Sequence, residues 1–197
     1  MPAGHDTRIP AWAPGPAGPM NPLILEQSFR NARALAFLRL SVGALFLIFG
    51  GYKVLGAQFT LHGGFEFWIN RFLEGGAYPW MVPVLRSFVL PHRTVIAFLV
   101  AYGELAIGLA LAFGLWVRAA SACAFLYMLT LLFSANYPGR EAPLWQYFGA
   151  SLDHSVLALC FLAFLFSRSD AVWSVGAWRD RRRGSAKQQP PPKESKP

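Results

Sequence analysis

Three ionisable side chains lie inside long apolar runs of this sequence, where charge is costly. They are Arg39, Glu104 and Asp153. A charged residue at the centre of a membrane costs about 2.5 kcal/mol or more, and such residues commonly pair with one another or mark a pathway for ions or protons. The functional interpretation is a polar pocket that binds a small molecule or relays protons. The alternative is an ion-pair lock that only fixes helix packing.

Several polar and aromatic side chains stand close to these three in the sequence. Lys53 ends the first apolar run, and His154 directly follows Asp153. Aromatic candidates to line a pocket are Tyr102, Tyr127, Trp145 and Tyr147. Packing in the core or at the membrane interface is the alternative for each of these aromatic residues.

The composition indicates a membrane protein. Hydrophobic residues make up 54% of the chain and charged residues 14%, whereas soluble domains are about 25% charged. The net charge of +8 could suit nucleic acid. The basic residues gather near the ends of the chain, however, which indicates attraction to anionic lipid headgroups. We therefore expect a lipid bilayer as the partner, and no nucleic acid.

Four apolar runs are long enough to cross a bilayer. They lie at about 33–54, 94–117, 119–137 and 147–167. A hydrocarbon core of about 30 Å needs roughly 20 helical residues, and the two-residue alternation of strands is absent. The sequence predicts an all-α membrane protein, a four-transmembrane-helix bundle within residues 33–170. Residues 1–32 are expected to form a flexible tail, and residues 171–197 an interfacial segment with a basic, proline-rich disordered tail.

The distribution of Lys and Arg predicts the orientation of the chain. With the N-terminus inside, twelve of the eighteen basic residues lie on the cytoplasmic side and five on the outer side. Cytoplasmic loops carry the excess of Lys and Arg in membrane proteins. We expect a multi-pass protein of the cell membrane, a bacterial inner membrane, with both termini cytoplasmic.

The first outer loop, from about residue 56 to 92, contains an amphipathic pattern. Its apolar members recur at steps of four, three and four residues: Leu61, Phe65, Trp68 and Phe72. This spacing is typical of one face of a helix. We expect an amphipathic helix in the outer membrane interface. Packing of the same face against the bundle is the alternative.

Glycines share helix faces with the charged residues. The first run carries a stripe at steps of four and three residues: Arg39, Gly43, Phe46, Gly50 and Lys53. Glu104, Gly108 and Leu111 repeat this pattern in the second run. Small residues let a neighbouring helix approach closely in membranes. We expect close helix packing at these glycines.

Counting residues from the ends of the runs places the three charged groups at similar depths. At a rise of ~1.5 Å per residue, Arg39 lies ~9 Å from the inner boundary and Glu104 ~15 Å from the outer one. Asp153 lies ~9–12 Å below the outer boundary on the same basis. We therefore expect Arg39, Glu104 and Asp153 to share one interior site.

The cysteine pattern argues against a metal site. Cys123 and Cys160 both lie in apolar runs, without a CxxC pair or a Cys/His spacing typical of zinc. We expect both to pack as small hydrophobic residues, with a redox pair as the alternative. No metal ligands are predicted.

The chain resembles the DoxX family, which includes membrane subunits of thiosulfate:quinone oxidoreductases. The resemblance covers roughly residues 33–170. It rests on Arg39, on GGYK from Gly50 to Lys53, on GFEFWINRF in the outer loop, on YGELAIGLALAFGLWVRAA from Tyr102 to Ala120, and on SLDH from Ser151 to His154. It implies a four-helix membrane bundle whose intramembrane polar positions match Arg39, Glu104 and Asp153.

The resemblance also implies a membrane component of a redox system linked to sulfur compounds and a membrane quinone. In that picture the chain is a subunit of a thiosulfate:quinone oxidoreductase-type complex, with a cytoplasmic redox or sulfur-metabolism protein as partner. Glu104 and Asp153 handle protons as catalytic residues. The residues expected to bind the substrate are Arg39, Lys53, Tyr102 and His154.

Two other functions compete with this one. The first is a non-catalytic membrane scaffold that recruits cytoplasmic partner enzymes through its basic inner face. The second is a small-solute transporter, which would require oligomerisation because four helices without an inverted repeat form a thin transporter.

Overall fold

The computed structural model describes residues 22–148 and 153–187, and within these ranges every regular element is helical. Three helices are long and apolar enough to cross a membrane: α1 (Pro22–Leu55), α4 (Arg93–Phe113) and α5 (Val117–Ala135). The expected all-α membrane fold is confirmed at this level. A further apolar helix, α6 (Asp153–Phe166), has 14 residues, fewer than the roughly 20 that span a hydrocarbon core.

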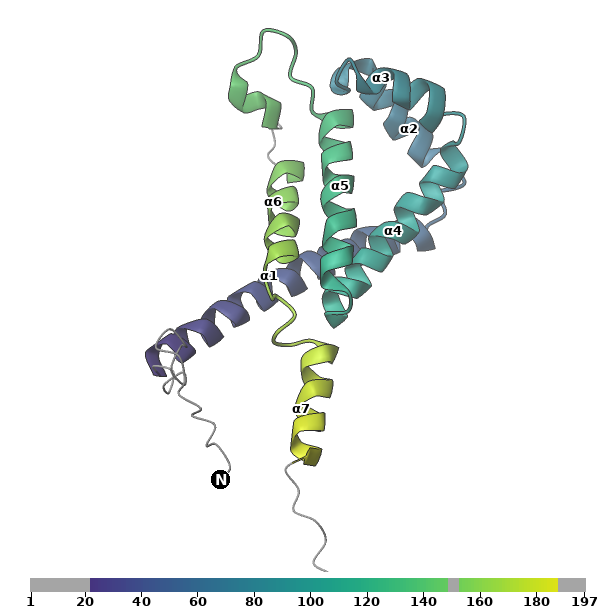
Figure 1. Cartoon of the computed structure of the whole chain (residues 1–197). Helices are drawn as coiled ribbons and strands as arrows, with labels where there is room; N and C mark the ends of the chain where they lie inside the picture. The colour runs from purple at the N-terminus through teal and green to yellow at the C-terminus, as the bar shows by residue number, and fades with distance from the viewer. Residues whose placement is uncertain (1–21, 149–152, 188–197) are drawn as a thin grey trace, which may run out of the picture.

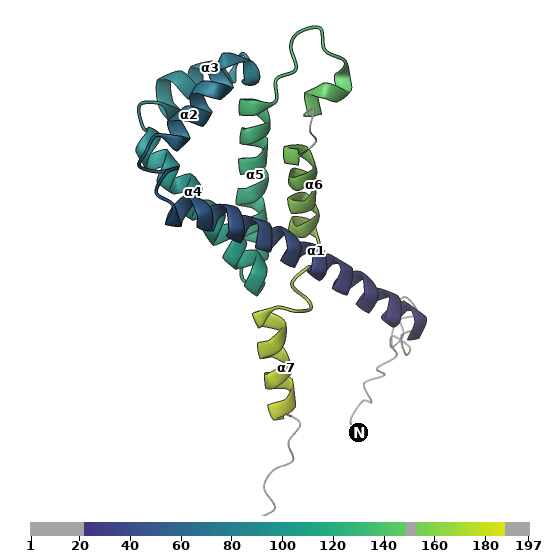
Figure 2. The same ribbon diagram turned by 180° about the vertical axis from the view of Figure 1, so that it is seen from behind.

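The helices pack as two pairs that cross each other. Figures 1 and 2 show α1 and α4 lying together, while α5 and α6 run side by side and α1 crosses them. The main core lies where the pairs meet. Its fully buried aromatic and aliphatic members include Leu111, Phe161 and Phe164. Phe46 and Phe161 meet edge to face with ring centroids 5.3 Å apart, which joins α1 to α6.

Helix α1 begins eleven residues before the expected first span. Residues 22–32 were assigned to the flexible tail, but they form its first turns. Proline suits the first position of a helix because its ring presets φ and its missing N–H has no intrahelical role there. The chain then runs to Gly43 without another proline or glycine, so nothing breaks the helix. Residues 1–21, the rest of the expected tail, lie outside the described ranges.

The outer loop folds into short helices that cover one end of α4 and α5. Helix α2 spans Gly64–Arg71, α3 spans Met81–Val84, and wide helical turns follow them at Phe72–Gly76 and Leu85–Val89. The helix expected in this loop is present, but its apolar stripe is split. Phe65 and Ile69 are buried, whereas Trp68 is exposed. Leu61 precedes the helix, because α2 begins only at Gly64.

The structure describes only part of the fourth expected span, residues 147–167. A 3₁₀ turn occupies Leu144–Phe148, and α6 begins at Asp153. Residues 149–152 between them lie outside the described ranges. The C-terminal segment contains more helix than expected, because α7 (Val175–Lys187) lies within residues 171–197, which were expected to form an interfacial segment and a disordered tail. Proline is absent from α7, and arginine, alanine and lysine favour helix.

Candidate functional site

A glycine seam joins α1 and α4 and sets their register. A Cβ added at Gly50 would lie 2.6 Å from the Leu105 backbone nitrogen, and one added at Gly108 would lie 2.7 Å from the Leu47 nitrogen. A Cβ added at Gly43 would lie 3.0 Å from the Leu111 Cβ and 3.1 Å from the Ala112 backbone nitrogen. Residue numbers rise along one helix as they fall along the other, so the two helices are antiparallel. The predicted close packing at these glycines is confirmed.

This register places Lys53 beside Glu104. The Lys53 Nζ lies 2.6 Å from Glu104 Oε1 and 2.7 Å from Oε2. The Tyr127 hydroxyl, from α5, donates to Glu104 Oε1 at 2.5 Å. The Glu104 side chain is 8% exposed and that of Lys53 is 21% exposed. A buried carboxylate is thus held by an ammonium and a phenol from two other helices.

The three groups can exchange protons with a molecule that reaches them. Each carries or accepts a proton, and the contacts between them are short, as charge-assisted hydrogen bonds are. Lys53 also lies over the Phe59 ring, with Nζ 4.8 Å from the ring centroid. The ammonium is therefore enclosed by a carboxylate and by an aromatic face, which both favour the positive charge.

A groove between α4 and α5 leads to this carboxylate. It has a volume of about 300 Å³ and is lined by Leu99, Val100, Gly103, Glu104, Ile107, Cys123 and Tyr127. Its walls are apolar except for the carboxylate, the phenol and the thiol. Because α4 and α5 are membrane-spanning candidates, a lipid-soluble molecule could enter from the side. We name Lys53, Glu104, Tyr127 and this groove the carboxylate site.

Arg39 does not belong to the carboxylate site, which corrects the expected grouping. Its side chain is fully buried, and all three guanidinium nitrogens donate to backbone carbonyls. Nε reaches Ser169 O at 3.1 Å, Nη2 reaches Trp173 O at 2.7 Å, and Nη1 reaches Leu111 O. Leu111 lies seven residues after Glu104 on α4, about 10 Å along the axis. The depth estimate failed because it ignored the register of α1 against α4.

Asp153 also lies away from the carboxylate site, at the first residue that the structure describes in α6. Its side chain is 53% exposed, and its Oδ1 accepts from the His154 backbone N–H at 2.7 Å. His154 Nδ1 donates to Asn136 Oδ1 at 2.8 Å. These residues border a cavity of about 640 Å³ near Arg71 and Glu74 of the outer loop. The three charged groups therefore occupy three separate places.

The remaining candidates divide between the site and the surface. Tyr102 is half-exposed and its ring stacks on Phe98, with centroids 6.1 Å apart, so it does not join Glu104. Cys123 is exposed at the groove, and Cys160 packs against the main core. In residues 22–148 and 153–187, no group of three or more His, Cys, Asp or Glu side chains is arranged to hold a metal ion.

Sequence reasoning missed the pairing of Lys53 with Glu104. The signal was present, since Lys53 ends the glycine stripe of α1 and Glu104 begins that of α4. Antiparallel packing of the two stripes brings their faces together, but the axial shift that sets Lys53 against Glu104 comes from the tertiary structure. The bond from Tyr127 had no comparable signal, because it depends on how α5 sits against α4.

Comparison with known proteins gives one match. No curated protein and no solved structure matches the chain. A family model described as DoxX matches residues 34–136. This stretch is more than half of the 197 residues and contains α4, α5, most of α1 and the whole carboxylate site. The chain therefore belongs to the DoxX family.

Proposed function

We propose that this chain is the membrane component of a redox system that links sulfur compounds to a membrane quinone, and that the carboxylate site supplies protons to the quinone. One observation carries the proposal: a buried carboxylate, bonded to an ammonium and a phenol, lines an apolar groove between two membrane helices. The groove suits a ring with two carbonyl oxygens, because its lining is apolar except for the Glu104 carboxylate, the Tyr127 phenol and the Cys123 thiol.

Reduction of a quinone takes two electrons and two protons and yields the quinol. A partner protein that oxidises the sulfur compound supplies the electrons. Tyr127 and Glu104, which line the groove, pass protons to the reduced oxygens, and Lys53 resupplies them through its contact with Glu104. The groove volume of about 300 Å³ is at the small end of ligand sites. It therefore holds the ring, while the isoprenoid tail lies in the lipid.

The proposal includes a four-span topology in the cell membrane. In it, α6 and the residues that precede it form the fourth span, both termini are cytoplasmic, and α2 lies at the outer interface. The apolar character of α6 supports the fourth span. The exposed Phe67 and Trp68 support contact of α2 with lipid. Asp153 and His154 then lie at the outer rim and take no part in the proton relay.

The test is quinone reduction by the reconstituted full chain together with its electron-donating partner. Glu104→Gln removes the charge and the proton acceptor, and we expect turnover to fall by at least 10-fold, as for loss of a general acid–base group. Glu74→Gln is the matched control, because Glu74 is 67% exposed and pairs with Arg71 at 3.4 Å. Equal turnover of the Glu104→Gln variant and the parent would reject the relay.

The alternative function is a scaffold that recruits cytoplasmic enzymes. Helix α7 favours it, because this basic helix projects beyond the bundle in Figure 1. The test is a chain that lacks residues 179–197, with a pull-down of bound proteins. A scaffold predicts loss of partners from this shortened chain while Glu104→Gln keeps them. Retention of the same partners after the deletion contradicts the scaffold.

A further inference from the structure

Exposed tryptophans mark the two ends of the membrane region. Trp116, Trp173 and Trp178 are exposed near the turn between α4 and α5. In Figure 1, α2 and α3 lie at the opposite end of α5. The exposed Trp68 belongs to α2, Trp80 directly precedes α3, and the exposed Trp145 lies in the 3₁₀ turn Leu144–Phe148. Tryptophan is enriched at both membrane–water interfaces. The α4–α5 turn therefore lies at the depth of the lipid headgroups, and so does the start of α7 beside it.

The buried Arg39 attaches the segment before α7 to this end of the bundle. It holds the carbonyls of Ser169 and Trp173 together with that of Leu111, near the end of α4. Trp173 has a φ of 50°, which is uncommon for a bulky residue. Its carbonyl bond to Arg39 helps to keep this conformation. The position of α7 is thus coupled to a fully buried contact.

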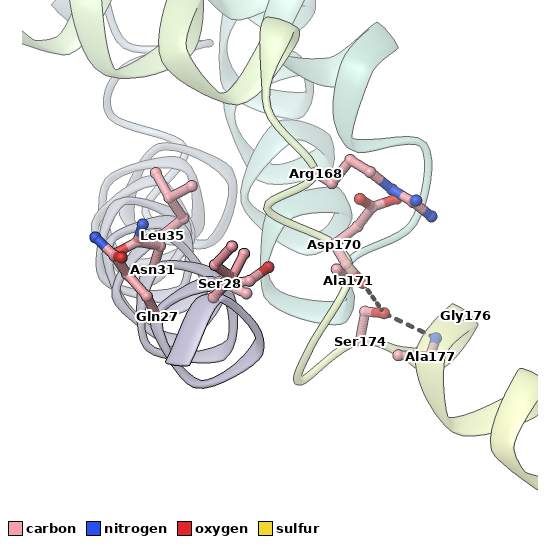
Figure 3. Close-up of a pocket in the computed structure, with 12 residues that line it drawn as sticks. Gln27, Ser28, Asn31, Leu35, Arg168, Asp170, Ala171, Ser174, Gly176 and Ala177 are labelled. Carbon is pink, nitrogen blue, oxygen red and sulfur yellow. Dashed lines mark hydrogen bonds between the residues drawn. The ribbon is translucent and has the colours of Figure 1, made fainter. Parts of the chain in front are cut away.

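Ser174 then fixes the first turn of α7. Its Oγ accepts from the Ala177 backbone N–H at 3.0 Å and donates to Asp170 O at 2.6 Å. Figure 3 shows both bonds, and Ser28 and Leu35 of α1 line the same cavity as this segment. A serine at this position is a strong helix N-cap. Helix α7 is therefore held in place at its start.

A groove of about 430 Å³ lies between the end of α4 and the start of α7. Its large apolar lining comes from Phe113, Trp173, Val175 and Trp178, and Arg181 completes it. The next residue, Arg182, places its guanidinium carbon 4.0 Å from the centroid of the Trp178 ring. An apolar wall thus ends at Arg181, and the guanidinium of the next residue, Arg182, lies over the Trp178 ring of the same wall.

We propose that this groove binds an anionic phospholipid. One acyl chain lies against Phe113 and Trp178, and the phosphate accepts hydrogen bonds from Arg181 and Arg182. Guanidinium groups match the geometry of phosphate oxygens. Helix α7 carries five basic residues and one acidic residue, which adds attraction for an anionic surface. A soluble protein partner would not require an apolar wall at the depth of the membrane interface.

The test uses the purified full chain in detergent micelles with added lipid. Phosphatidylglycerol and phosphatidylcholine with identical acyl chains are titrated, and bound lipid is counted by native mass spectrometry. We expect preferential retention of phosphatidylglycerol by the parent. The variant with Arg181→Gln and Arg182→Gln together should lose this preference, with affinity on the order of 10-fold lower. Arg71→Gln in the outer loop is the matched control.

Two further variants keep the result interpretable. Replacement of Arg181 and Arg182 by lysine keeps the charge and should retain most of the preference even if the glutamine variant unfolds. A chain that ends at Lys187 removes the basic residues of the tail and should bind as the parent does. Equal retention of the two lipids by the parent, or loss of the preference on tail removal alone, overturns the proposal. None of these outcomes depends on quinone turnover.

Discussion

The two basic residues on one face of α1 are stabilised in different ways. Lys53 pairs with the Glu104 carboxylate. The three guanidinium nitrogens of Arg39 instead each donate a hydrogen bond to a backbone carbonyl. The difference arises because Lys53 and Arg39 contact α4 at different positions along its axis. Lys53 meets the interior of α4, whose backbone groups are already paired, so its partner must be a side chain.

Arg39 meets the C-terminal end of α4 instead. The last four carbonyls of a helix have no intrahelical partner, and this end carries partial negative charge. Leu111 lies within the last turn of α4, which ends at Phe113. The planar guanidinium donates in three directions and so joins this carbonyl to two in the segment before α7. Two basic residues on one face of α1 thus have different partners: Lys53 bonds a buried carboxylate, and Arg39 bonds backbone carbonyls.

The largest effect is expected from Lys53→Met. This change leaves the Glu104 carboxylate buried without its cation, and breaking a buried pair costs about 3–5 kcal/mol. We expect a large fall in the free energy of unfolding, measured by thermal denaturation in detergent. Combining Lys53→Met with Glu104→Leu should recover most of that loss, because no buried charge then remains. A double variant as unstable as the single one would show that the pair contributes through packing alone.

A smaller effect is expected from Arg39→Lys. Lysine keeps the charge, but one ammonium cannot reach three separate carbonyls. We expect a loss of about 2–3 kcal/mol, since hydrogen bonds to a charged group contribute about 1.5–3 kcal/mol each and part of this is regained. The segment before α7 should also be released, so that trypsin cleaves faster after Arg168. Arg33→Lys on the exposed face of α1 is the control, and equal cleavage rates in both variants would contradict this role.

The smallest effect is expected from Gly50→Ala. A Cβ there meets the α4 backbone at 2.6 Å, and overpacking costs about 1–3 kcal/mol, against up to about 1 kcal/mol gained in helix propensity. We expect a net loss of about 1–2 kcal/mol, with quinone turnover reduced because Lys53 moves away from Glu104. Gly51→Ala is the control, because a Cβ there meets no atom within 4 Å. Equal stability of the two variants would exclude a tight seam at Gly50.

Local patterns in the sequence were sufficient to predict the class of protein and one helix interface. Mean composition and run length predicted the membrane helices, because the bilayer core sets both. The stripe from Arg39 to Gly50 predicted the buried face of α1, because a helix repeats its face every three or four residues. The family match over residues 34–136 agrees with the motifs in these same helices.

These sequence patterns did not predict the axial register between helices that are far apart in the chain. Arg39 and Glu104 were expected to meet, yet the antiparallel seam separates them and brings Lys53 to Glu104. Asp153 was expected to share their interior site, yet its half-exposed side chain lies beside His154 at the first described residue of α6. Periodicity determines which face of a helix is buried, whereas the axial shift between two helices depends on how their glycines and side chains fit together. Only the tertiary structure therefore decided that one buried cation serves the carboxylate site while the other holds the start of α7.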